Sequence, residues 1–85
     1  TDPDVNVELG KSLLRYGQHE QALLRLSEAA RAGRNEAAVL VMIGLCFAGL
    51  ERREESETAY RTALHVDPGH VGAMLNLALQ LEREN

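Results

Sequence analysis

The sequence predicts an all-α fold of five helices that pack as antiparallel hairpins. Glycine and proline divide the 85 residues into five segments of helix length, and none shows the alternating β-branched pattern of a strand. The connections between the segments are only a few residues long, which favours consecutive helices running side by side in opposite directions. Residues of similar class also recur at an offset of 34 residues, which is typical of a repeated hairpin.

The first hairpin is expected to use residues 3–16 and 18–32. Asp2 is a suitable N-cap for its first helix, and Pro3 fits the first helical position. Gly17 interrupts the helical pattern. Gly33 follows the second segment and supplies a C-terminal stop.

The third helix is expected to follow Asn35 as its N-cap and to last until Leu50. Residues 37–50 are fourteen successive apolar or glycine residues. A membrane-spanning helix needs about 20 such residues, so this run predicts a helix with neighbours on most of its sides. The fourth helix is expected over 52–66, because Pro68 disfavours helical geometry in Asp67, and the fifth over 71–83.

Composition narrows the classes of partner. The chain is 45% hydrophobic and 26% charged, which is ordinary for a folded soluble protein. A net charge of −4 without a block of basic residues disfavours nucleic acid and anionic membranes as partners. The single cysteine, Cys46, is expected to be a small core residue in a reducing compartment, which favours a cytoplasmic location.

The internal repeat alternates large and small residues. The offset of 34 aligns Leu9 with Ile43 and Leu77, Gly10 with Gly44 and Ala78, and Leu13 with Phe47 and Leu81. Small residues let two helices approach closely, and the large residues beside them fill the remaining space.

This pattern resembles the tetratricopeptide repeat family. The residues that carry the resemblance are Leu40, Ile43, Gly44 and Phe47, then Ser56, Tyr60, Ala63 and Leu64, and finally Asp67 and Pro68. The resemblance implies an α-solenoid that occupies residues 1–85 as a single domain. Its repeats would be 3–36, 37–70 and a truncated third repeat, 71–85.

The resemblance implies a non-catalytic protein-interaction or scaffold module. Partners of such arrays lie along a concave groove lined by the first helix of each hairpin. The groove residues carried over are Val7, Lys11, Leu14, Arg15, Ala38, Val41, Met42, Leu45, Leu75, Asn76, Leu79 and Arg83. Their apolar centre favours an amphipathic helix or a hydrophobic peptide. Coverage of these residues by neighbouring repeats, or by self-association, is the alternative.

The last helix suggests a homodimer. Its residues Met74, Leu77, Ala78 and Leu81 are expected to face the second helix of a third hairpin, which the sequence does not contain. Either the native chain continues, or two copies cover each other through the C-terminal helix.

No enzyme activity, metal or cofactor is expected. His19, His65 and His70 lack the spacing of metal ligands on a helix, and no phosphate-binding or nucleophile motif occurs. The alternative function is a regulatory or targeting segment of a larger multidomain protein whose activity lies outside this chain.

Overall fold

The computed structural model describes residues 2–84, which form five α-helices and no strand. The helices are α1 (Pro3–Arg15), α2 (His19–Arg31), α3 (Ala37–Gly49), α4 (Arg53–Val66) and α5 (Val71–Glu84). The prediction of an all-α chain with five helices is confirmed, and the helix bounds lie close to the predicted ones. Within the described range no helix is long and apolar enough to cross a bilayer.

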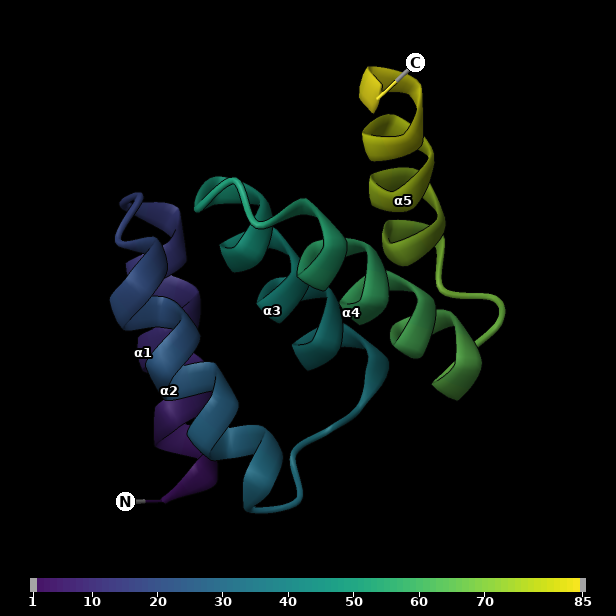
Figure 1. Cartoon of the computed structure of the whole chain (residues 1–85). Coiled ribbons are helices and arrows are strands. Elements are labelled where there is room, and N and C mark those ends of the chain that lie inside the picture. The colour runs from purple at the N-terminus through teal and green to yellow at the C-terminus, as the bar shows by residue number, and fades with distance from the viewer. Residues whose placement is uncertain (1, 85) are drawn as a thin grey trace.

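The helices follow one another along an elongated body of 40 × 25 × 17 Å (Figure 1). α1 and α2 lie side by side, as do α3 and α4. Both α1 and α2 contact α3, and α5 contacts both α3 and α4. In the part of the chain that the structure describes, α5 does not touch the first hairpin. The contacts therefore run from the first hairpin to the second and from the second hairpin to α5.

Three of the helices end in the same backbone turn. A residue with positive φ follows each helix: Gly17 (77°), Gly33 (106°) and Glu51 (60°). The next amide in each case donates back across the last turn: Gln18 N to Leu13 O at 2.8 Å, Arg34 N to Ala29 O at 2.9 Å and Arg52 N to Phe47 O at 2.9 Å. This is the Schellman arrangement, which glycine tolerates best. The sequence indicated it at the two glycines but gave no sign of it at Glu51.

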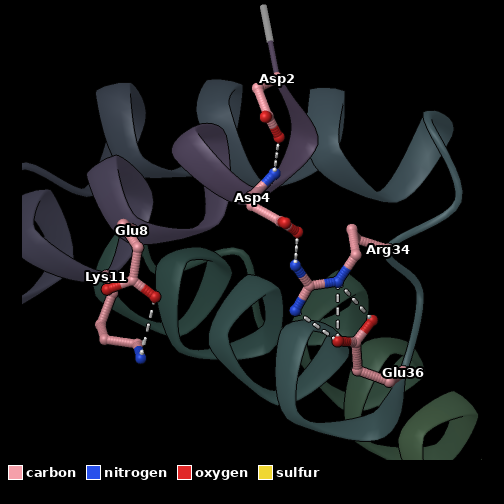
Figure 2. Close-up of polar contacts among 6 residues, drawn as sticks. All are labelled: Asp2, Asp4, Glu8, Lys11, Arg34 and Glu36. Carbon is pink, nitrogen blue, oxygen red and sulfur yellow. Dashed lines mark hydrogen bonds and ion pairs between the residues drawn. The ribbon is translucent and has the colours of Figure 1, made fainter.

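The helix N-termini are capped differently. The Asp2 carboxylate accepts a hydrogen bond from the Asp4 amide at 2.8 Å, as predicted (Figure 2). Asn35 does not cap α3, because Glu36 occupies the N-cap position and makes no side-chain cap bond. At α5 the His70 Nδ1 accepts from the Ala73 amide at 3.0 Å.

The Arg34 side chain links the connection between the two hairpins to the start of α1. Its guanidinium donates to the Glu36 carboxylate at 2.6 and 2.9 Å and also to the Asp4 carboxylate (Figure 2). The paired guanidinium lowers the pKa of Glu36 below its usual value. The connection after α2 is thus held by charge as well as by its turn.

The buried side chains form two clusters. The first joins α1, α2, α3 and α4 through Val7, Ala22, Leu26, Ala29, Val39, Ile43, Cys46 and Ala59. The second joins α3, α4 and α5 through Ala37, Val41, Tyr60, Ala63, Ala73 and Leu77. Because α3 contributes to both clusters, it needs apolar residues on most of its circumference. This accounts for the apolar run, and burial raises the pKa of its Cys46 thiol to about 11.

Candidate partner-binding surfaces

In each hairpin a large side chain lies on a glycine of the facing helix. A Cβ added to Gly10 would lie 2.5 Å from Leu26 Cγ, and one added to Gly44 would lie 2.5 Å from Tyr60 Cε1. Both glycines and both large residues are 34 positions apart, so the two hairpins pack alike. The third residue of the glycine series, Ala78 on α5, is exposed, and none of the five described helices covers it.

Two of the predicted groove residues lie in the interior. Val7 belongs to the first buried cluster and Val41 to the second. Their burial differs from the expectation of an open groove at these positions. The reason is that α1 contacts α3 and α3 contacts α5, so each first helix covers part of the one before it.

The other ten groove residues are at least partly accessible. Half-buried positions are Leu14, Met42, Leu45 and Asn76, and exposed positions are Lys11, Arg15, Ala38, Leu75, Leu79 and Arg83. Leu14 and Met42 pack against the first cluster and Leu45 against the second. Among the large apolar residues of this groove set, Leu75 and Leu79 on α5 are the most exposed, at 56% and 44%.

Polar groups beside these leucines are partly engaged already. The Asn76 Nδ2 donates to the Gly72 carbonyl at 2.8 Å within α5, so its carbonyl oxygen is what it can offer to a partner. The Lys11 ammonium lies 3.5 Å from the Glu8 carboxylate, and both groups are exposed (Figure 2). Exposed pairs of this kind contribute at most about 1 kcal/mol, so Lys11 remains able to exchange its partner.

The four residues predicted for self-association separate into two pairs. Leu77 is buried in the second cluster, and Leu81 is half-buried beside it. Met74 and Ala78 are exposed. Only the outer part of this set is therefore open to another molecule.

α1 carries an exposed apolar surface that was not predicted from the sequence. Val5 is 47% exposed, whereas Val39, its equivalent at an offset of 34, is 1% exposed. Likewise, Leu9 is exposed, whereas its equivalent Ile43 is buried. In the second hairpin these positions face α2, and among the described helices none precedes α1 to cover them. The offset itself was the signal that could have revealed this surface.

Among residues 2–84 no group of three or more His, Cys, Asp or Glu side chains is placed to hold a metal ion. His70 uses its Nδ1 to cap α5. Cys46 is buried, and its raised pKa keeps the thiol neutral at physiological pH.

The accessible apolar residues of α5 occupy two sides of the helix. We call Leu75, Asn76 and Leu79 the inner face, and Met74, Ala78 and Leu81 the outer face. A step of one residue turns the helix by about 100°, which separates Met74 from Leu75. Comparison of the chain with models of protein families, and with curated proteins, finds no match.

Proposed function

We propose that this chain is a protein-interaction module that binds an apolar peptide or an amphipathic helix. The binding surface would be formed by the first helix of each hairpin and centred on the inner face of α5. The proposal rests on one observation above all, the exposure of Leu75 and Leu79 on consecutive turns of α5. Exposed leucines that form a continuous patch are characteristic of interaction surfaces.

The neighbouring side chains extend this patch towards α3. Leu45 of α3 is half-buried and packs against the cluster that contains Ala73 and Leu77 of α5. In the proposed arrangement its accessible part adjoins the same surface. An amphipathic helix could place apolar residues at i, i+3 and i+4 against Leu75, Leu79 and Leu45. Desolvation of these side chains would supply most of the binding free energy.

Charges flank the patch at both ends of the molecule. Lys11 and Arg15 are exposed on α1, and Arg83 is exposed at the end of α5. Such rim charges contribute more to the orientation and rate of association than to affinity. An acidic residue near either end of a bound peptide would suit them.

The proposed arrangement is a short α-solenoid related to tetratricopeptide repeats. Support comes from the pattern at Leu40, Ile43, Gly44 and Phe47, and from contacts that run from the first hairpin to the second and from the second hairpin to α5. In such a stack the first helices share one side. The accessible residues of α3 and α5 would then form a continuous surface.

Selection of peptides tests this function. A displayed library of helical peptides is selected against the chain, and each selected peptide is labelled for fluorescence anisotropy. The Leu75→Glu, Leu79→Glu double variant should weaken binding at least about tenfold, because it places two charges in an apolar contact. Val66→Glu, at an exposed apolar residue of α4, is the matched control and should leave affinity unchanged.

One outcome of this selection would exclude the inner face of α5 as the binding site. If the selected peptides bind the double variant as tightly as the wild type while Val66→Glu abolishes binding, the inner face of α5 is not the site. Circular dichroism of each variant establishes that the helices remain formed, since all three substituted residues are exposed.

A further inference from the structure

A groove separates α2 from α4. Both helices lie against α3, yet among the described residues no Cα of α2 comes within 8 Å of a Cα of α4. Ala59 of α4 belongs to the first buried cluster, and Leu23 of α2 and Phe47 of α3 pack against that cluster from the surface. The groove is built from α2, α3 and α4 alone, so neither end of the described chain borders it.

One part of this groove is an apolar cavity of about 360 Å³. Its apolar walls are Leu23 and Leu24 of α2 and Leu50, the C-cap residue of α3. Leu24 is 55% exposed, so an apolar side chain that entered here would remove much leucine surface from water. Residues of both charges, Glu20 and Arg31 among them, stand at the rim. This cavity therefore suits an apolar side chain better than a charged one.

The second part of the groove is an acidic cavity of about 400 Å³. Its lining consists of Phe47, Glu54, Glu55, Thr58 and Ala59, and contains no basic side chain. The two glutamates are exposed, whereas the phenylalanine is half-buried. An aromatic ring beside carboxylates suits a guanidinium group, which can stack on the ring and donate hydrogen bonds to the carboxylates.

Arg52 shows this chemistry within the chain. Its guanidinium carbon lies 5.0 Å from the centre of the Phe47 ring, and its nitrogens donate to the Glu55 carboxylate at 2.7 and 2.8 Å. Because Arg52 also lines the apolar cavity, it stands where the two cavities adjoin. Glu54 takes part in none of the ion pairs among residues 2–84, so its charge is available to a ligand.

We propose that the groove between α2 and α4 binds a segment of another protein that carries one arginine and one large apolar residue. The arginine would enter the acidic cavity beside Glu54, and the apolar residue would lie against Leu24. Charge complementarity carries the choice of arginine, and the net charge of −4 favours the approach of a basic segment. This site uses none of the inner face of α5, so it goes beyond the proposed function.

The probes are short peptides, acetylated and amidated at their ends, with one arginine and one leucine separated by one to six serines. Two matched series replace the arginine by glutamate or the leucine by serine. Each peptide is titrated into the ¹⁵N-labelled chain, and amide chemical shifts give both the affinity and the site. With the best spacer, shifts should centre on Leu24, Leu50, Thr58 and Ala59. Each replacement should weaken binding at least about threefold.

An exchange of charge tests the role of Glu54. Glu54→Arg should weaken the arginine peptide and strengthen the glutamate peptide, each by about threefold or more. Glu82→Arg on α5 makes the same change in net charge and should alter the preference much less. Circular dichroism checks that both variants fold, since both residues are exposed.

The apolar contact is tested separately. Leu24→Ser should abolish the difference between the leucine peptide and its serine version, because the apolar wall is then lost. Leu75→Glu, Leu79→Glu should retain binding of the arginine–leucine peptide. Failure at the inner face and failure at this groove can thus be told apart.

Three results would overturn the proposal. One is that no spacer gives a peptide that moves amides of both cavities at millimolar concentration. Another is that Glu82→Arg reverses the preference for arginine over glutamate as fully as Glu54→Arg does, because binding would then follow net charge alone. The third is a dimer in sedimentation that Glu54→Arg dissolves and that excludes the peptides, since the occupant would then be a second copy.

Discussion

The Ser56 hydroxyl of α4 donates a hydrogen bond to the Gln80 side-chain oxygen of α5, and both residues are buried. The Gln80 Nε2 in turn donates to the Arg53 carbonyl at 3.0 Å. Arg53 begins α4, so Gln80 links the first turn of one helix to the body of the next. This polar link joins α5 to the second hairpin beside the buried contacts of Ala73 and Leu77.

Loss of this link should destabilise the fold. Ser56→Ala leaves the Gln80 oxygen buried without its donor, which should lower the free energy of unfolding by about 1–2 kcal/mol. The Ser56→Ala, Gln80→Leu double variant removes both partners and should recover part of that loss. Urea unfolding of the wild type, the single variants Ser56→Ala and Gln80→Leu, and the double variant measures the coupling. Strict additivity of the two single effects would contradict a direct interaction.

Asn6 should be a weak point of the first hairpin. It is 3% exposed, and its Oδ1 has no hydrogen-bond partner. The equivalent positions carry Leu40 and Met74, so the site accepts an apolar side chain of similar size. Asn6→Leu should raise the free energy of unfolding by about 1–2 kcal/mol.

Asn76→Leu is the control for this change, because the Asn76 amide is half-buried and bonds to Gly72. Asn76→Leu should raise the free energy of unfolding by less than Asn6→Leu does. Equal stability of wild type and Asn6→Leu in urea would mean that the Asn6 oxygen has a partner in solution.

Glu51→Gly should also stabilise the chain. Glu51 has a φ of 60°, at the position where the first hairpin has Gly17 with a φ of 77°. A side chain costs roughly 1 kcal/mol in this left-handed region, and glycine avoids that cost. Thermal unfolding should show a higher midpoint for Glu51→Gly, whereas Gly17→Ala should lower it. A lower midpoint for Glu51→Gly would show that the Glu51 side chain makes a stabilising contact.

Stability should depend on the Arg34–Glu36 pair in a defined pH range. Arg34 lowers the pKa of Glu36, so the folded state holds this proton less tightly than the unfolded state. The resulting stabilisation is complete above the ordinary pKa of 4.5 and is lost as the pH falls through the lowered value. Because the pair is exposed, solvent screens it and its contribution to stability should be small.

Urea unfolding at pH 7, 4 and 3 measures this contribution. Glu36→Gln should be less stable than the wild type at pH 7, and the difference should shrink towards pH 3. Glu82→Gln, at an exposed residue of α5, should change stability little at any of these values. A difference for Glu36→Gln that stays constant down to pH 3 would contradict the assigned pair.

The helices could be predicted from sequence because their ends carry local signals. Gly17, Gly33 and Pro68 act on the backbone of their own turns, so their effect does not depend on distant contacts. The cap at Asn35 was predicted from residue type alone. That prediction was wrong, because Glu36 occupies the N-cap position. The loop before α3 is held by the ion pair of Arg34 with Asp4, which is 30 residues away in the sequence.

The candidate surfaces were harder to predict than the helices. The pattern of apolar and polar residues predicts which side of a helix a residue lies on, but not how far the next helix covers that side. For this reason Val7 and Val41 were expected in an open groove. The Ser56–Gln80 link was also missed, because hydrogen bonding between residues 24 apart has no local signature. Leu75 and Leu79 were expected to be accessible because the resemblance places them in the groove, and both are exposed.

The central claim is that a partner binds along the inner face of α5. It is tested most directly by methyl NMR of the chain, with leucine and valine methyl groups labelled, as a peptide selected for binding is added. If a partner binds there, the methyl signals of Leu45, Leu75 and Leu79 should shift together in proportion to occupancy, while those of Leu24 and Val66 stay in place. Shifts confined to Leu24 or Val66, with Leu75 and Leu79 unchanged at saturation, would contradict it.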